Sequence, residues 1–203
     1  MENTPQFAKL VEADIREAWP HEAHRFTPWL AENLDHIGEA VGLRLEAEGA
    51  EVNVEGFSAD ILARDISSGS LVLIENQLEG SDHKHLGQIM TYLAGLDAKI
   101  VIWIAAGFHP AHLSAIKWLN EHTEGEFAFF AIRVKVVRIG TSPFAPVFEV
   151  LERPNTWEKQ LHAAASAGGR SEIAERRHEF WRTFVEQIPG ELERGGPPAY
   201  TSN

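Results

Sequence analysis

Two short stretches, Gly56-Phe-Ser-Ala-Asp60 and Leu71-Val-Leu-Ile-Glu75-Asn-Gln77, decide the fold of this chain. Isoleucine and leucine alternate with other residues around Asp60, and residues 71–74 form a continuous apolar run. We therefore predict two β-strands joined by a turn that is rich in serine and glycine. In that arrangement the carboxyl groups of Asp60 and Glu75 are cross-strand neighbours.

Paired carboxylates at the inner ends of two strands suit a divalent cation. Mg²⁺ takes oxygen ligands and keeps several waters, so two carboxylates and a substrate phosphate are sufficient for a site. A cation held by Asp60 and Glu75 would lower the pKa of its water and offset charge on the attacked phosphate, which is metal-assisted hydrolysis. The alternative is that Asp60 ends a hydrogen-bonded turn and Glu75 is a solvated strand end.

The segment after these strands predicts a helix with a polar stripe. Ser81 or Asp82 is a suitable N-cap, and apolar residues follow at helical spacing. His85, Gln88 and Tyr92 fall on one face of that helix, and we assign them to substrate binding, because such side chains can bond phosphate oxygens or a base edge. The alternative is a surface helix with ordinary polar residues.

Taken together, these motifs resemble the PD-(D/E)XK nuclease superfamily, with the Q-x-x-x-Y element of its RecB-like and λ-exonuclease-like members. Several longer phrases resemble a large group of uncharacterised prokaryotic proteins placed in that superfamily. The phrases are Ile74-Glu-Asn-Gln-Leu78, Asp82-His-Lys-His-Leu-Gly-Gln88, Thr91-Tyr-Leu-Ala-Gly-Leu-Asp97, Val101-Ile-Trp-Ile-Ala105 and Trp118-Leu-Asn120. The likeness covers most of the chain, from about Pro28 to Trp157.

The resemblance implies that Asp60 and Glu75 bind the metal, Mg²⁺ or Mn²⁺, as catalytic residues. Gln77 stands where such nucleases carry a lysine that orients or activates the attacking water. Its amide can orient a water but supplies no positive charge, and some active restriction enzymes are similar in having glutamine there. An acidic residue on the preceding helix often completes the metal site. We assign Glu39 to this role, although a solvated helix face explains its charge equally well.

The order of predicted elements indicates an α/β fold with an αβββαβ core, which the resemblance identifies as restriction-endonuclease-like. A helix at 28–42, with Pro at its first position and Gly42 at its end, precedes three strands. A helix, a strand at 98–105, a helix at 110–122 and a strand at 127–138 follow. Because residues 100–105 are apolar throughout, the central mixed sheet must carry helices on both faces. Trp103 and Trp118 are expected in the core.

The predicted nuclease-like domain spans 27–160 and has an extension on each side. The N-terminal extension, 1–26, is predicted to be helical, with an amphipathic helix at 5–19. Residues 161–203 are predicted to form a linker, an amphipathic helix with several aromatic residues and a disordered tail. That aromatic helix needs a partner surface, which is either its own core or a second subunit in a homodimer.

The net charge of −12 argues against a general nucleic-acid binder, because such proteins draw most of their affinity from lysine and arginine contacts with phosphates. Part of the acidic charge, however, lies in the two extensions. Six residues of the core could form a basic rim, although a lysine or arginine taken singly is more often solvated surface: Lys84, Lys99, Lys117, Arg133, Lys135 and Arg138.

Composition excludes some classes of site and compartment. The chain has no cysteine, so disulfides, thiolate catalysis and cysteine zinc sites are excluded. No signal peptide opens the sequence, and no apolar run reaches the roughly 18 residues of a membrane span. We therefore expect a cytoplasmic protein without a membrane partner.

Two functions of different class follow. The first is a Mg²⁺-dependent deoxyribonuclease that hydrolyses phosphodiester bonds. The second is a catalytically weak or inactive nuclease-like module that binds nucleic acid or a protein partner, and this alternative follows from Gln77 and the acidic net charge.

Overall fold

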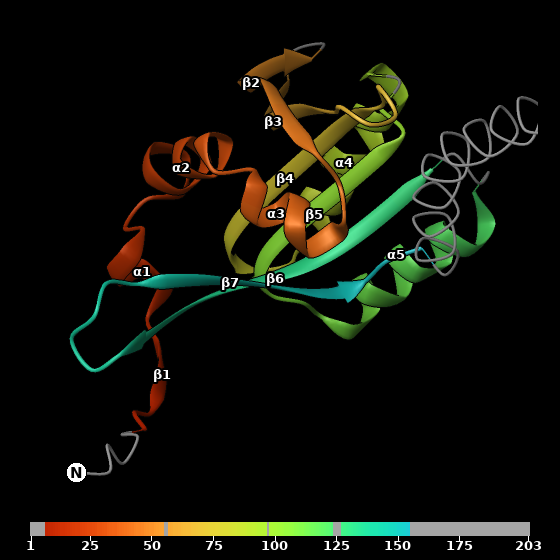
Figure 1. Ribbon diagram of the computed structural model, residues 1–203. Helices are drawn as coiled ribbons and strands as arrows, with labels where there is room; N and C mark the ends of the chain where they lie inside the picture. The colour runs from red at the N-terminus through yellow and green to blue at the C-terminus, as the bar shows by residue number, and fades with distance from the viewer. Residues whose placement is uncertain (1–6, 55–56, 97, 124–126, 155–203) are drawn as a thin grey trace, which may run out of the picture. The chain divides into compact units, whose positions relative to one another are not determined.

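The computed structural model describes residues 7–54, 57–96, 98–123 and 127–154, which all belong to one compact unit, Met1–Trp157 (Figure 1). The predicted linker, aromatic helix and tail at 161–203 lie outside the described residues. The homodimer hypothesis depends on that helix, so it stays a prediction.

A seven-stranded mixed sheet forms the centre of the described unit (Figure 1). Its strands are β1 (Leu10–Ala13), β2 (Leu45–Val54), β3 (Phe57–Asp65), β4 (Leu71–Gly80), β5 (Ile100–Gly107), β6 (Ala128–Ile139) and β7 (Ala145–Glu152). The strand order is β1-β6-β5-β4-β3-β2, and β7 also pairs with β6. The β4–β5 and β5–β6 pairs are parallel and the others are antiparallel, so the predicted mixed sheet is confirmed.

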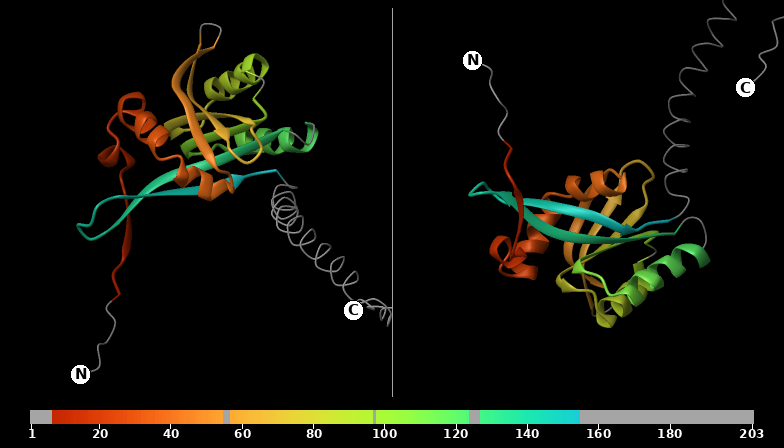
Figure 2. Two further views of the ribbon diagram at one scale, coloured as in Figure 1. Left: turned by 45° about the horizontal axis from the view of Figure 1, so that its top comes forward. Right: turned by 90° about the horizontal axis from the view of Figure 1, so that it is seen from below.

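Helices cover both faces of this sheet, as predicted (Figure 2). The helices are α1 (Ile15–Ala18), the short π-helix η1 (Glu22–Phe26), α2 (Thr27–Glu32), α3 (Asp35–Val41), α4 (His83–Leu96) and α5 (Pro110–His122). The first four pack on one face and α4 and α5 on the other. Residues 100–105 of β5 are all buried between the two layers, which explains why that strand is apolar throughout.

Each layer has its own apolar core. Trp19, Phe26, Leu30 and Ile37 pack on one face of the sheet against alternate strand residues such as Ile74. The opposite core contains Ile89, Tyr92, Trp103, Ile116 and Phe129. Alternate residues of β4 therefore point into different cores. This alternation determines which polar residue of the strand faces which layer.

The N-terminal segment differs from the prediction. Instead of one helix at 5–19, the chain forms strand β1, whose Leu10 pairs with Ile139 of β6, and then the four-residue helix α1. The apolar side chains of Leu10 and Val11 are exposed, so they do not form the buried helical stripe that their spacing indicated. Pairing with the edge of β6 satisfies the backbone groups of this segment, and that long-range contact overrides the local periodicity.

The helix predicted at 28–42 is two helices, because the chain breaks at Asn33 and Leu34 between α2 and α3. The Asn33 side-chain amide donates to the Trp29 carbonyl oxygen at 2.7 Å, which satisfies an acceptor in the last turn of α2. Gly42 ends α3 in the left-handed region, with φ of 75°, as the sequence indicated.

The two tryptophans predicted for the core have different environments. Trp103 is fully buried, as expected, whereas the expectation for Trp118 is wrong, because its side chain is 57% exposed and stacks on His122. The inward face of α5 is formed by His112, Ile116 and Leu119. Trp118 adjoins Leu119 in sequence, so the helical rotation turns it away from the sheet.

Candidate metal-binding site

The candidate site lies where the β3–β4 ladder ends. The register of this ladder runs from Arg64↔Leu71 to Ile61↔Ile74, so Asp60 and Glu75 are the next opposed pair. The β2–β3 hairpin continues beyond this point, away from the β4–β5 pair (Figures 1 and 2). Beyond this point, side-chain oxygens instead of backbone carbonyl oxygens accept the hydrogen bonds from the backbone N–H groups of the two separating strands.

Two reciprocal hydrogen bonds replace the missing ladder. The backbone N–H of Asp60 donates to Glu75 Oε1 at 3.3 Å, and the backbone N–H of Asn76 donates to Asp60 Oδ2 at 2.8 Å. The Asn76 side-chain amide also donates to Asp60 Oδ2, at 3.0 Å. The structure therefore brings the two predicted carboxylates together across neighbouring strands.

Burial and mutual repulsion disfavour the charged forms of both acids. Burial is the main cause that raises the pKa of Asp60 to about 6, and the carboxylates of Glu51 and Glu22 add to it. Burial also raises the pKa of Glu75 to about 8, and the neighbouring Asp60 charge is the next cause. Glu75 is 1% exposed. Within the described ranges neither acid has a lysine or arginine ion-pair partner, so no such partner offsets the charge of the pair.

The Gln77 side chain follows Glu75 on the same face of β4, and it is buried. Its Nε2 donates to the Gly80 carbonyl oxygen at 2.6 Å, and its Oε1 accepts the indole N–H of Trp103 at 3.0 Å. Both ends of the amide are thus bonded within the protein. The bond to Trp103 joins β4 to β5, so Gln77 has a structural role that its sequence motif did not indicate.

The stripe of His85, Gln88 and Tyr92 faces the sheet near the acidic pair and does not form an ordinary surface face. Asp82 accepts the backbone N–H of His85, as an N-cap does, and also binds His85 Nδ1 at 3.0 Å. The electrostatic effect of His85 on Asp60 lowers the pKa of that acid, opposite to the effects of Glu51 and Glu22.

The other two members of the stripe are more deeply placed. Tyr92 is fully buried, and its hydroxyl donates to the Ser58 carbonyl oxygen on β3 at 2.9 Å. Gln88 Nε2 lies 3.3 Å from the Tyr92 hydroxyl. Gln88 Oε1 is buried and has no hydrogen-bond partner among the described residues. A buried acceptor without a donor is costly in a folded protein, so this oxygen is suited to a donor from a bound molecule.

Glu39, which was predicted as a third metal ligand, is exposed on α3 and lies beside Leu43 and Arg44 at a separate open cavity. The break after α2 gives α3 a different course, and the acids that influence Asp60 are instead Glu22 and Glu51. No group of three or more His, Cys, Asp or Glu suited to one metal ion occurs in the described part of the chain.

Glu22 is the residue near the pair that sequence reasoning missed. Its Oε2 accepts the backbone N–H of Leu78, at the end of β4, at 2.5 Å. No local motif identifies it, because a contact between residues 22 and 78 depends on how η1 packs against the sheet. Only its position on a helix before the first strand of the hairpin was a usable signal.

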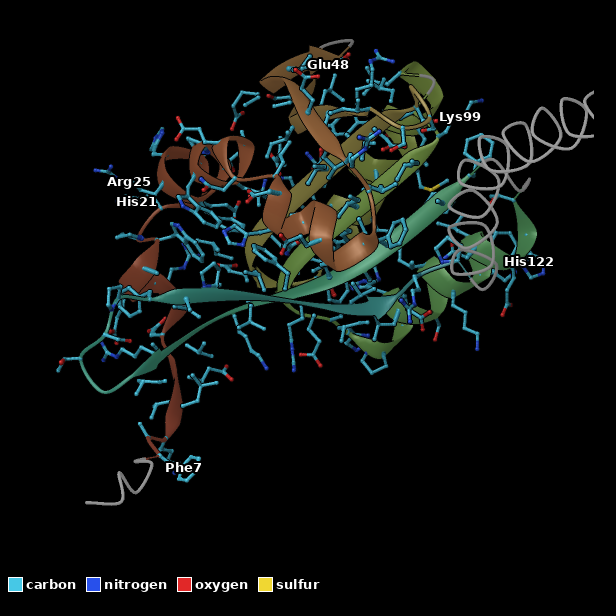
Figure 3. The ribbon with its side chains drawn as sticks, in the orientation of Figure 1. Phe7, His21, Arg25, Glu48, Lys99 and His122 are labelled. Carbon is cyan, nitrogen blue, oxygen red and sulfur yellow. The ribbon has the colours of Figure 1, made fainter. Side chains whose placement is uncertain are left out.

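Half of the predicted basic rim is neutralised by acidic neighbours. Three of its six members form ion pairs with acidic residues: Arg133–Glu149 at 2.6 Å, Lys135–Glu149 at 3.6 Å and Arg138–Glu17 at 3.7 Å. The ammonium group of Lys99, at the start of β5, lies 4.9 Å from the centre of the Phe127 ring (Figure 3). Lys84 and Lys117 are exposed. Surface lysines and arginines that already have acidic neighbours add little attraction for a polyanion.

No helix within the described ranges is long and apolar enough to cross a membrane. No protein-family model matches the chain. No curated protein matches it either.

The chain has distant structural similarity to two solved structures. One is described as the crystal structure of a repair endonuclease from Pyrococcus abyssi, with 19% identity and a TM-score of 0.39 over 48% of this chain and 42% of that one. The other is described as the structure of an EndoMS–dsDNA2 complex, with 14% identity and a TM-score of 0.40 over 64% of this chain and 49% of that one. The chain therefore matches less than half the length of each structure, and the candidate function rests on the acidic pair itself.

Proposed function

We propose that this protein is a metal-dependent nuclease that hydrolyses DNA phosphodiester bonds, with Mg²⁺ or Mn²⁺ held by Asp60 and Glu75. One observation carries the proposal: the buried carboxylate of Glu75 and the partly buried carboxylate of Asp60 are adjacent, without a lysine or arginine ion-pair partner among the described residues. Such a pair keeps a proton at neutral pH unless a cation replaces it. Binding of a divalent cation would let both acids ionise.

The donor set suits a hard cation. Carboxylate oxygens are the protein ligands that Mg²⁺ prefers, and two of them leave positions for water and for a substrate phosphate. When bound, the cation would lower the pKa of a water and offset charge on the attacked phosphate. DNA as the substrate is supported by the resemblance of the Glu75-Asn-Gln77 and Gln88/Tyr92 motifs to PD-(D/E)XK nucleases. Glu39 is left out of the proposed ligand set because it lies beside a cavity that neither Asp60 nor Glu75 lines.

The neighbouring side chains receive distinct proposed roles. His85 Nδ1 is bound by Asp82, so Nε2 is the ring atom that remains to contact a substrate phosphate. Gln88 Oε1 would accept a hydrogen bond from a bound water or nucleotide. Gln77 would orient the attacking water through the amide hydrogen that is not donated to Gly80. Tyr92 would act through Gln88 and the β3 backbone.

DNA cleavage by the purified full chain tests this proposal. Linear, circular and single-stranded DNA are incubated with Mg²⁺, with Mn²⁺ and with a chelator. We expect metal-dependent cleavage that falls at least about a hundredfold in Asp60→Asn and in Glu75→Gln. Glu79→Gln is the matched control, because Glu79 is an exposed acid on the same strand, paired with Arg16. Intact DNA under every condition, or cleavage unchanged in Glu75→Gln, would contradict the proposal.

A second candidate is a nuclease-like module that binds nucleic acid or a protein partner without cutting. It is favoured by the buried Gln77 amide, which replaces a lysine and is bonded at both ends. Arg133 and Arg138 are paired with acidic residues, which weakens their attraction for DNA and favours a module without cutting activity. Calorimetric titration with Mn²⁺ separates the two functions, because a non-catalytic module needs no carboxylate metal site. Tight Mn²⁺ binding that is lost in Glu75→Gln would count against this second candidate.

A further inference from the structure

We propose that Thr27 and Asn76 are positioning residues that hold the Asp60 carboxylate in the orientation required to bind a cation. The proposal rests on the function proposed above and assigns a role to residues on the opposite face of the sheet. Thr27 begins α2, and Asn76 points from β4 toward that helix layer. Neither residue is part of the acidic pair.

A continuous chain of hydrogen bonds connects the three side chains. The Thr27 hydroxyl donates to Asn76 Oδ1 at 3.0 Å. The Asn76 amide Nδ2 donates to Asp60 Oδ2 at 3.0 Å, and the Asn76 backbone N–H donates to the same oxygen at 2.8 Å. Thr27 is 1% exposed and Asn76 is fully buried, so water does not compete for these bonds.

The donor and acceptor roles in this series of hydrogen bonds have one consistent assignment. An ionised carboxylate only accepts hydrogen bonds, so Asn76 must present its NH₂ group to Asp60 and its carbonyl oxygen to Thr27. The threonine hydroxyl supplies the donor that this carbonyl oxygen needs. Without the hydroxyl, the amide could rotate and turn its oxygen toward the carboxylate, which is repulsive. Thr27 therefore fixes the orientation of the Asn76 amide, and that amide fixes the orientation of the Asp60 carboxylate.

The arrangement divides the two oxygens of Asp60 between structure and ligand binding. Oδ2 is bound by two donors of Asn76, whereas no described donor is bonded to Oδ1. Oδ1 is therefore the oxygen available to a cation. Glu22 fixes the same helix layer to β4 at a second point, through the backbone N–H of Leu78. Two contacts from residues 22–27 thus hold the end of β4 that carries the site, much as outer-shell partners orient metal ligands.

Titration calorimetry with Mn²⁺ on the full chain is the first test. In Thr27→Val we expect Mn²⁺ affinity at pH 7 to fall at least about fivefold and the pH midpoint of Mn²⁺ binding to rise, because Asp60 loses a well-oriented donor. Thr27→Ser restores the hydroxyl and should return the affinity to within about twofold of wild type. Thr123→Val is the matched control, because the Thr123 hydroxyl bonds the Leu119 carbonyl oxygen at the end of α5, on the other face of the sheet.

A thermodynamic cycle without metal separates this inference from the proposed function. Melting temperatures are compared for wild type, Thr27→Val, Asp60→Asn and the double variant at pH 7, with Thr27→Ala in place of valine if the valine variant does not fold. We expect non-additive effects, since Thr27 acts on Asp60. If the effects couple but wild type binds no Mn²⁺, the proposed metal function fails while the positioning of Asp60 stands. Additive effects, or equal Mn²⁺ affinity in Thr27→Val and wild type, would overturn the inference.

Discussion

Strand β3 carries two carboxylates, Asp60 near its middle and Asp65 at its end, and the two have opposite properties. Asp65 is 3% exposed, yet its pKa is lowered, because hydrogen bonds from Ser68, Ser67 and Arg44 more than compensate for burial. The backbone N–H of Arg44 donates to Asp65 Oδ1 at 3.2 Å. The Ser68 hydroxyl donates to Asp65 Oδ2 at 2.6 Å. Asp60, five positions earlier, has a raised pKa and faces other acids.

The difference shows that burial alone does not decide whether the pKa of a carboxylate is raised or lowered. Asp65 is surrounded by donors, so its charge stabilises the turn that follows β3. Asp60 shares its surroundings with Glu75, Glu51 and Glu22, so its charge is disfavoured until positive charge is added. Local donors stabilise the charge of Asp65 within the chain, whereas the charge of Asp60 has no such set of donors and is the one we propose a cation stabilises.

The largest expected effect is on the structural acid. Asp65→Ala removes the acceptor for several donors in a buried turn, so we expect the free energy of unfolding to fall by about 3 kcal/mol. Chemical denaturation at pH 7 measures it. Asp35→Ala, at an exposed position on α3, is the control and should change stability by less than about 0.5 kcal/mol. A loss in Asp65→Ala no larger than this control would remove the basis of the comparison.

Substitution of Glu75, a proposed metal ligand, should change the free energy of unfolding in the opposite direction. Glu75→Gln keeps an oxygen for the Asp60 N–H but removes the buried charge, so at pH 8 without metal we expect unfolding free energy to rise by about 2 kcal/mol. Differential scanning calorimetry in chelator, with Glu79→Gln as control, checks the sign. Destabilisation by Glu75→Gln would mean that its carboxylate is compensated by positive charge.

The pH dependence of stability should also separate the two acids. The pKa values of Asp60 and Glu75 are raised on folding, so the folded state holds their protons more tightly and stability falls as pH rises from about 4.5 to about 8. The pKa of Asp65 is lowered, so its contribution is instead lost as pH falls below 4.

Comparison of wild type with the double variant Asp60→Asn/Glu75→Gln separates the pH dependence that comes from these two acids from that of other titrating groups. We expect the stability difference between the two proteins to change by about 1.5 kcal/mol between pH 5 and pH 8, and Mg²⁺ to reverse the change in wild type alone. Urea midpoints measured across this range provide the readout. Parallel pH profiles for the two proteins would show that folding does not raise the pKa values of these acids.

The smallest effect concerns the residue that supports Gln77. Trp103→Phe removes the indole N–H bonded to Gln77 Oε1, so we expect a loss of about 1 kcal/mol and weaker Mn²⁺ binding through a less fixed β4 end. Trp118→Phe, at an exposed position, should change stability by less than about 0.5 kcal/mol. Equal effects of the two substitutions would show that the Gln77 contact does not stabilise the site.

Patterns of near neighbours in the sequence predicted most of the described fold. The apolar runs of β4 and β5 and the helical spacing in α4 and α5 placed these elements close to their observed limits, since each must bury an apolar face. The same patterns failed at residues 5–19, where pairing with β6 decided the structure. They also joined α2 and α3, because a break at Asn33 has no strong local signal.

The sequence by itself indicated the two acidic residues and their position opposite each other on adjacent strands, because strand alternation and turn chemistry are local properties. It placed them at strand ends, whereas both lie well inside β3 and β4. Only the tertiary structure decided which groups surround them: it brought Glu22, Thr27 and His85 to the pair and left Glu39 elsewhere. The bonding of Gln77 to Trp103 was also decided there. These contacts join residues that are far apart in sequence, and they depend on how helices dock on the sheet, which no short-range pattern encodes.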